Sequence, residues 1–419
     1  MASVQSLRSV KRLGIRLHPI FPVGIVATWF CVATLALLGP MPLRAAGSRM
    51  DKLAIFWKSR EDWQERSDSI RAAILTGAKL TPLPERTPLN AQIANRRVRG
   101  SYTVEDVAFE ASPGFYVFGN LYRPFPSGKR VPGILVTHGH FTEDGWYART
   151  RPENQILCAT LAEMGAVVFT YDMVGWGDSR QVQHNVPDVL RLQLWDSIRA
   201  VDFLLSLPEI DPERLGITGA SGGATQTILL AAVDDRIRAS MPVVMVSSGY
   251  SGSDPCEDGM NIRKIPGQPD TNNAEIAAVN APNPLFLISD GIDWTKHFPQ
   301  EDFPDIRRIY ELFGATQNVG NKHFPKGKHD YGPDYRQLAY QFFSQTFGMS
   351  PPPIIETAPI ESQRDQAVRN WIHLNVAFPV DEKESSGGLV HEAYQASRRV
   401  SRALWDSGVR VADWIAMLW

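Results

Sequence analysis

The sequence predicts an α/β fold built on a doubly wound, mostly parallel sheet. Segments rich in Val, Ile and Leu alternate along the chain with segments of helical length. The apolar segments lack the polar alternation of a sheet with one solvated face, so we expect helices to cover both faces. An antiparallel hairpin precedes this alternation and is expected to lead the chain into the sheet.

The elements before the parallel strands follow from local patterns. Residues 50–79 place apolar side chains among charges at helical spacing, which predicts one or two amphipathic helices packed on the core. Residues 80–90 are rich in proline and are expected to break the helix. Residues 102–111 and 115–124 have strand composition, and Ser112-Pro113-Gly114 between them predicts a hairpin.

The parallel part of the sheet is expected from an alternation of buried strands and helices. In chain order we predict strands at 133–140, 166–172, 214–219, 239–247 and 283–291, and helices at 154–165, 190–207, 224–233 and 335–347. Ligands of such sheets bind beyond the carboxyl ends of the strands. The loops that follow each strand are therefore where functional residues are expected.

The chain divides into three predicted parts, 1–46, 47–350 and 351–419. Basic residues precede the apolar stretch 19–40, which is typical of a signal peptide or of an N-terminal membrane anchor, so we expect the body to be exported: periplasmic, secreted or anchored facing outside. Residues 389–419 predict an amphipathic helix. That helix is expected to pack on the domain or on a second subunit of a homo-oligomer, or to lie on a membrane surface.

Composition limits the range of partners. The chain has 419 residues, 43% of them hydrophobic, and a formal net charge of −2. It therefore lacks the basic character of a nucleic-acid-binding protein. Cys158 and Cys256 follow the N-terminal part, and their spacing fits either one disulfide or two buried thiols but no C-x-x-C metal motif.

Gly219-Ala220-Ser221-Gly222-Gly223 matches the pattern G-x-S-x-G between a predicted strand and a predicted helix. In this context the pattern predicts a nucleophile elbow, in which small neighbours allow the strand and the helix to approach each other around a strained serine. A structural glycine turn is the alternative. We interpret Ser221 as the nucleophile.

A serine nucleophile needs a base that is itself oriented by a carboxylate, in the chain order Ser, acid, His. His329 lies in a glycine-containing loop before the last predicted helix and is the expected base, with His323 as the alternative. Asp293 follows the strand at 283–291 and is the expected acid. Asp290 is expected to cap the turn around Gly291 instead.

An oxyanion hole is expected from backbone N–H groups. Gly222 follows the nucleophile directly and is expected to supply one group, and His140 or Phe141, after the strand at 133–140, the other. His138-Gly139-His140 also suggests metal binding, but no further ligand follows at matching spacing. The sequence therefore predicts no metal site.

Other loops at the same edge of the sheet are expected to support the site. Asp172 and Asp178, in the loop after the strand at 166–172, are expected to cap turns. The segment 256–263 is expected either to line a pocket for the acyl or leaving group or to be a structural loop. The residues that we expect to line a substrate pocket are Phe141, Trp176, Glu257 and Trp294.

Together with "YDMVGWGDS", "TNNAEIAAV", "ISDGIDWT" and "KHDYG", these motifs make the chain resemble the α/β-hydrolase superfamily over about residues 50 to 345. More narrowly, it resembles the acetyl xylan esterase-like exported bacterial hydrolases, neighbours of the dienelactone hydrolases. The resemblance implies Ser221, Asp293 and His329 as a catalytic triad, with His140 and Gly222 as oxyanion donors.

From these residues we expect a metal-independent serine hydrolase without a cofactor. Its expected substrate is a small-molecule or carbohydrate ester with a short, acetyl-type acyl group, cleaved through an acyl-enzyme. A serine peptidase of the prolyl-oligopeptidase type is the alternative, although too few residues precede the first core strand for a propeller. A non-catalytic binding protein on the same scaffold is a further alternative.

Overall fold

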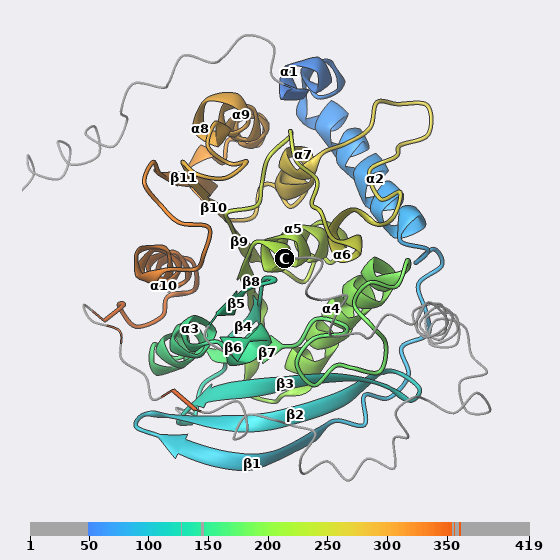
Figure 1. Cartoon of the computed structure of the whole chain (residues 1–419). Helices are drawn as coiled ribbons and strands as arrows, with labels where there is room; N and C mark the ends of the chain where they lie inside the picture. Colours follow the sequence, from blue (N-terminus) through green and yellow to red (C-terminus); the bar gives the residue numbers. More distant parts are fainter. Residues whose placement is uncertain (1–48, 127, 144–145, 354–355, 357–359, 362–419) are drawn as a thin grey trace, which may run out of the picture. The chain divides into compact units, whose positions relative to one another are not determined.

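The computed structural model describes residues 49–353 except 127, 144 and 145, together with residues 356, 360 and 361 (Figure 1). All of these lie in one compact unit, Arg44–Trp419. The predicted signal peptide or anchor at 1–46 and the predicted helix at 389–419 lie outside the described residues. Those two interpretations therefore stay predictions.

Within the described residues, nine strands form one sheet in the order β1-β2-β3-β7-β4-β8-β9-β10-β11. The strands are β1 (Gln92–Arg99), β2 (Tyr102–Ser112), β3 (Phe115–Pro124), β4 (Val131–Thr137), β7 (Val167–Tyr171), β8 (Ile210–Ala220), β9 (Ala239–Val243), β10 (Leu285–Asp290) and β11 (Val319–Phe324). A small separate ribbon pairs β5 (Thr142–Glu143) with β6 (Trp146–Tyr147).

The six strands β7, β4, β8, β9, β10 and β11 run parallel to one another. Strands β1, β2 and β3 form an antiparallel meander that joins the sheet at β7. Thr137 pairs with Gly219, and Ala220 pairs with Val243, so the last residues of β4, β8 and β9 lie at one edge. This confirms the predicted α/β class with a mostly parallel sheet. The loops that leave this edge carry the residues of the candidate site.

Helices cover both faces of the sheet (Figure 1). The described helices are α1 (Arg49–Leu53), α2 (Arg60–Gly77), α3 (Pro152–Glu163), α4 (Val189–Ser206), α5 (Gly222–Val233), α6 (Pro255–Asp258), α7 (Asn273–Ala278), α8 (Phe298–Glu301), α9 (Phe303–Leu312) and α10 (Pro333–Phe347), with short 3-10 turns at Ala54–Phe56, Ala148–Thr150 and Thr316–Asn318. Residues of α3 and α10 share one buried apolar cluster, and residues of α2, α4, α5, α7 and α9 belong to the other. Two cores, one on each face, therefore enclose the parallel strands.

The edge strand β1 is polar and irregular. Its pairing with β2 shifts register between Ala94 and Arg97, and Asn95 adopts a positive φ of 52°. Arg97 donates to Asp106 at 2.8 Å and to Glu361 at 2.7 Å. A bulged strand with paired charges is a common form of a sheet edge.

Helix α2 confirms the predicted amphipathic helix before the sheet. Ser59 caps it, since its side chain accepts from the N–H of Asp62 while the Asp62 carboxylate accepts from the N–H of Ser59. Arg66 donates to both carboxylate oxygens of Glu275 on α7, at 3.1 and 2.7 Å. Both side chains are fully buried, so this ion pair ties α2 to the domain.

Both cysteines that follow the N-terminal part are free, buried thiols. The structure thus selects the thiol alternative over the disulfide. None of the helices in the described part of the chain combines the length and apolar composition needed to cross a bilayer.

We predict that Glu275→Gln lowers the free energy of unfolding by about 3–5 kcal/mol, because it leaves the buried Arg66 cation without its anion. Urea denaturation measures the change. The matched control is Glu213→Gln, which removes the exposed pair with Arg238 and should cost less than about 1 kcal/mol. Equal effects of the two substitutions would show that the buried pair does not anchor α2.

Candidate active site

Ser221 lies between β8 and α5 with φ 56° and ψ −125°, a strained conformation for a residue other than glycine. Gly219 and Gly223, on either side of Ser221, allow the turn to approach the end of β4 closely. A Cβ at Gly219 would lie 2.2 Å from Thr137 Oγ1, and a Cβ at Gly223 would lie 2.3 Å from the Thr137 carbonyl oxygen. Only glycine fits at both positions, so the motif holds Ser221 on a sharp strand-to-helix turn.

His329 lies between Ser221 and Asp293. Its Nε2 atom is 2.9 Å from Ser221 Oγ, and its Nδ1 atom is 2.6 Å from Asp293 Oδ2. The other carboxylate oxygen of Asp293 accepts from the N–H and the hydroxyl of Thr295, both at 2.6 Å. Since a carboxylate only accepts, His329 donates through Nδ1–H, and its Nε2 can accept the Ser221 proton.

The two alternative residues have other partners. Asp290 Oδ1 accepts from the N–H groups of Ile292 and Asp293, at 2.8 and 3.0 Å, which is the predicted turn cap. His323 lies on β11, and its Nδ1 is 2.9 Å from Ser289 Oγ. The geometry therefore places Asp293 and His329, not Asp290 and His323, in line with Ser221.

The expected oxyanion donors lie next to each other. Gly222 is the first residue of α5, where an N–H group has no acceptor within its own helix. The His140 ring packs on it so closely that a Cβ at Gly222 would lie 2.4 Å from His140 Cε1. A Cβ at Gly139 would lie 2.7 Å from the carbonyl oxygen of Ala220, so this loop passes directly over the turn. The oxyanion role itself stays a prediction.

His138 is a structural residue that ties together the loops after β4 and β7. The N–H of Met173 donates to His138 Nε2, so Nδ1 carries the ring proton and donates to the Gly139 carbonyl, both at 2.9 Å. Burial lowers the pKa of His138 to about 3. The ring is therefore neutral at neutral pH.

Two of the four expected pocket residues border His329. The ring centroids of Trp294 and Phe141 lie 4.8 and 5.7 Å from that of His329. Trp176 instead contacts the ring of His140, at 5.6 Å. Glu257 accepts from the N–H groups of residues 253 and 254 and caps α6, which favours the structural interpretation of its segment.

A buried arginine supports the loop after β7 and was not predicted. Arg149 donates to Asn120 at 2.7 Å, to Asp178 at 2.8 Å and to Asp172. The two aspartates thus form ion pairs with Arg149. Asp172 also accepts a hydrogen bond from the N–H of Asp178. Nothing near Arg149 in the sequence signals this contact, because its partners come from two distant segments, β3 and the loop after β7.

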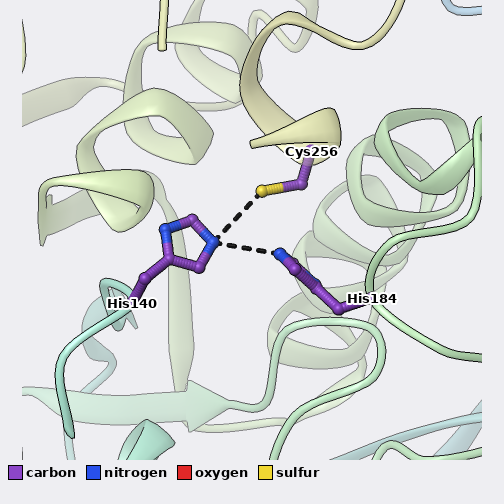
Figure 2. A group of neighbouring side chains, drawn as sticks. All are labelled: His140, His184 and Cys256. Carbon is purple, nitrogen blue, oxygen red and sulfur yellow. Dashed lines mark hydrogen bonds between the residues drawn. The ribbon is translucent and has the colours of Figure 1, made fainter. Parts of the chain in front are cut away.

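A second group of side chains meets at His140 (Figure 2). Its Nε2 atom lies 3.0 Å from His184 Nε2 and 3.3 Å from Cys256 Sγ. These three residues offer atoms that could hold a metal ion. The sequence interpretation found no further ligand near His140, because His184 and Cys256 follow it by many residues and reach it only through the fold.

Comparisons with known proteins agree with this architecture. The family model for acetyl xylan esterase (AXE1) matches residues 87–252. The structure of methylesterase BT1017 is similar with a TM-score of 0.75 and 33% sequence identity, over 85% of this chain and 82% of that one. A glucuronoyl esterase from Solibacter usitatus, 16% identical, shares the fold with a TM-score of 0.52 over 70% of this chain and 95% of that one.

Among curated sequences, the uncharacterized protein PA2218 of Pseudomonas aeruginosa is 29% identical over 198 residues. The match covers 45% of this chain and 48% of that protein. The chain thus spans about half of the length of this curated relative.

The buried, neutral state of His138 predicts a pH dependence of stability. An unfolded histidine takes up a proton below pH 6.5, whereas the folded ring stays neutral down to about pH 3. The contribution of the neutral His138 ring to the free energy of unfolding is therefore fully present above pH 6.5. It falls on acidification, by about 2 kcal/mol between pH 7 and 5.

We expect His138→Gln to flatten the pH dependence of the unfolding free energy by that amount, since Gln does not titrate. Denaturation at several pH values measures the difference in slope. Parallel slopes for the wild type and the variant would contradict a depressed pKa at His138.

Proposed function

Because the chain belongs to the α/β-hydrolase superfamily, among its acetyl xylan esterase-like carboxylic ester hydrolases, we propose that it is a serine esterase acting on carbohydrate esters. The observation that carries the proposal is the alignment of Ser221 Oγ, the His329 ring and Asp293 at 2.9 and 2.6 Å. The strained turn that presents Ser221 supports the same assignment.

In the proposed reaction, Ser221 Oγ attacks the ester carbonyl while His329 Nε2 takes the hydroxyl proton. Asp293 holds the Nδ1–H tautomer and stabilises the imidazolium that forms. The N–H groups of Gly222 and His140 bind the oxyanion. His329 then protonates the leaving alcohol, and a water molecule that it activates releases the acid from the acyl-enzyme.

We propose that one side of the substrate's ester bond is small. Either the acyl group or the alcohol is the small side. The acetyl xylan esterase family match favours a short acyl group, the first candidate. The 33% identity to a methylesterase favours a small alcohol, the second candidate. Acetate release from acetylated polysaccharide and methanol release from methyl-esterified polysaccharide distinguish them, while turnover of aminoacyl arylamides alone would favour a peptidase.

We also propose that the enzyme is exported, because basic residues precede the apolar stretch 19–40. Fractionation of expressing cells, followed by mass determination of the mature N-terminus, tests export and distinguishes a cleaved segment from a retained one.

We predict that Ser221→Ala lowers kcat for a short-chain aryl ester on the order of 10⁴-fold or more, because the nucleophile is lost. Hydrolysis is followed by absorbance, and labelling with a fluorophosphonate should disappear as well. Ser289→Ala is the matched control, since this serine contacts His323 instead of His329. A Ser221→Ala protein that still turns over the ester would refute the assignment.

We predict a loss of kcat of about 10⁴-fold for Asp293→Asn, because an amide at this position disfavours the Nδ1–H tautomer of His329. Asp290→Asn keeps the oxygen that accepts from the turn and should retain most of the activity. Steady-state kinetics of both variants measure the contrast. The reverse order of effects would transfer the acid role to Asp290.

A further inference from the structure

We propose that His140, His184 and Cys256 form a binding site for Zn²⁺ beside the Ser221 turn. The three residues come from the loop after β4, the loop after β7 and helix α6, and their donor atoms point toward one another (Figure 2). Two imidazole nitrogens and one thiolate are a donor set that zinc prefers. The inference does not depend on the proposed esterase activity.

The spacing of the donor atoms fits a single ion. Tetrahedral zinc, with Zn–N near 2.0–2.1 Å and Zn–S near 2.3 Å, requires about 3.3 Å between two nitrogens and about 3.6 Å between nitrogen and sulfur. His140 Nε2 lies 3.0 Å from His184 Nε2 and 3.3 Å from Cys256 Sγ. Displacements of a few tenths of an ångström would bring these two pairs to the zinc distances, and all three ligand atoms lie within 4.8 Å of one another.

A polar partner lies at the far side of each ring, which leaves the Nε2 atoms facing the proposed ion. His184 Nδ1 lies 2.6 Å from the Val174 carbonyl oxygen, which only accepts, so Nδ1 carries the proton and Nε2 carries a lone pair. His140 Nδ1 lies 3.5 Å from the Asp254 carboxylate. Histidine ligands of metals usually donate their second N–H to a carbonyl or a carboxylate in this way.

In the metal-free protein, the contacts with His184 and Cys256 share one ring nitrogen, His140 Nε2. His184 Nε2 carries a lone pair and can accept from His140 Nε2–H at 3.0 Å, whereas a His140 ring with its proton on Nδ1, beside Asp254, turns a second lone pair toward it. A divalent cation would satisfy both nitrogens and the sulfur at once, with the thiol proton released to solvent. A fourth ligand, such as water, would complete the tetrahedron.

Bound zinc would connect three segments at the edge of the candidate active site. The His140 ring packs directly on Gly222, the residue after Ser221. An ion held by His140, His184 and Cys256 would therefore fix the loop over the turn and stabilise the fold. It takes no part in the proposed chemical steps.

The experiment uses the full chain without an affinity tag, treated with a chelator and then titrated with Zn²⁺ or Co²⁺. We expect about one Zn²⁺ per chain by elemental analysis, a thiolate-to-cobalt charge-transfer band, and a higher melting temperature with zinc. Cys256→Ser should abolish the band and weaken zinc binding at least about 10-fold. His184→Gln should weaken binding similarly with the thiol still in place.

Cys158→Ser is the matched control, because Cys158 is the other free, buried cysteine, on α3. This variant should keep the cobalt band and the zinc stoichiometry. The proposal is overturned if the wild type binds no stoichiometric zinc, if the cobalt complex lacks the thiolate band, or if Cys256→Ser and His184→Gln bind zinc as tightly as the wild type. Because zinc takes no part in the proposed chemical steps, the two proposals fail separately: a wild type that hydrolyses esters but binds no stoichiometric zinc overturns only the zinc site.

Discussion

The close approach of three backbone segments determines the rest of the candidate site. The ends of β4 and β8 and the first turn of α5 meet where Thr137, Gly219 and Gly223 leave no room for a further side chain. The chain must turn within one residue there, and Ser221 takes the strained φ that this turn demands. The paired strands and the two apolar cores on either face over-determine this conformation, so the strain persists in the folded protein.

The sequence predicted those elements whose pattern is local. Each buried parallel strand is a short run of branched apolar residues, and α2 and α10 have helical periodicity, so all of them were recognised. Strands β1 and β11 were missed because they lie at the two edges, where solvent permits polar residues such as Arg97 and Lys322 and removes the apolar signal. The six-residue helix α7 is too short to show helical periodicity, whereas the ten-residue helix α9 was missed although its sequence is amphipathic.

The same distinction holds for the site. Ser221 and Asp293 each follow a predicted strand, His329 precedes a predicted helix, and the chain order expected for a triad links them, so the sequence alone could place them together. Cys256, His184 and Arg149 belong to contacts that arise from packing between distant segments, with His140 or Asp172 as their partners. Contacts of this kind follow from loop conformations, which residue spacing does not encode.

The edge strand β1 has a consequence for how molecules of this protein meet. A regular, apolar edge would offer a row of free backbone groups to a strand from another chain. Here the shift between Ala94 and Arg97 interrupts that row, and Glu361 neutralises Arg97 and Arg99 within the same chain. The bulge and the paired charges thereby make this edge a poor template for a strand from a second copy of the chain.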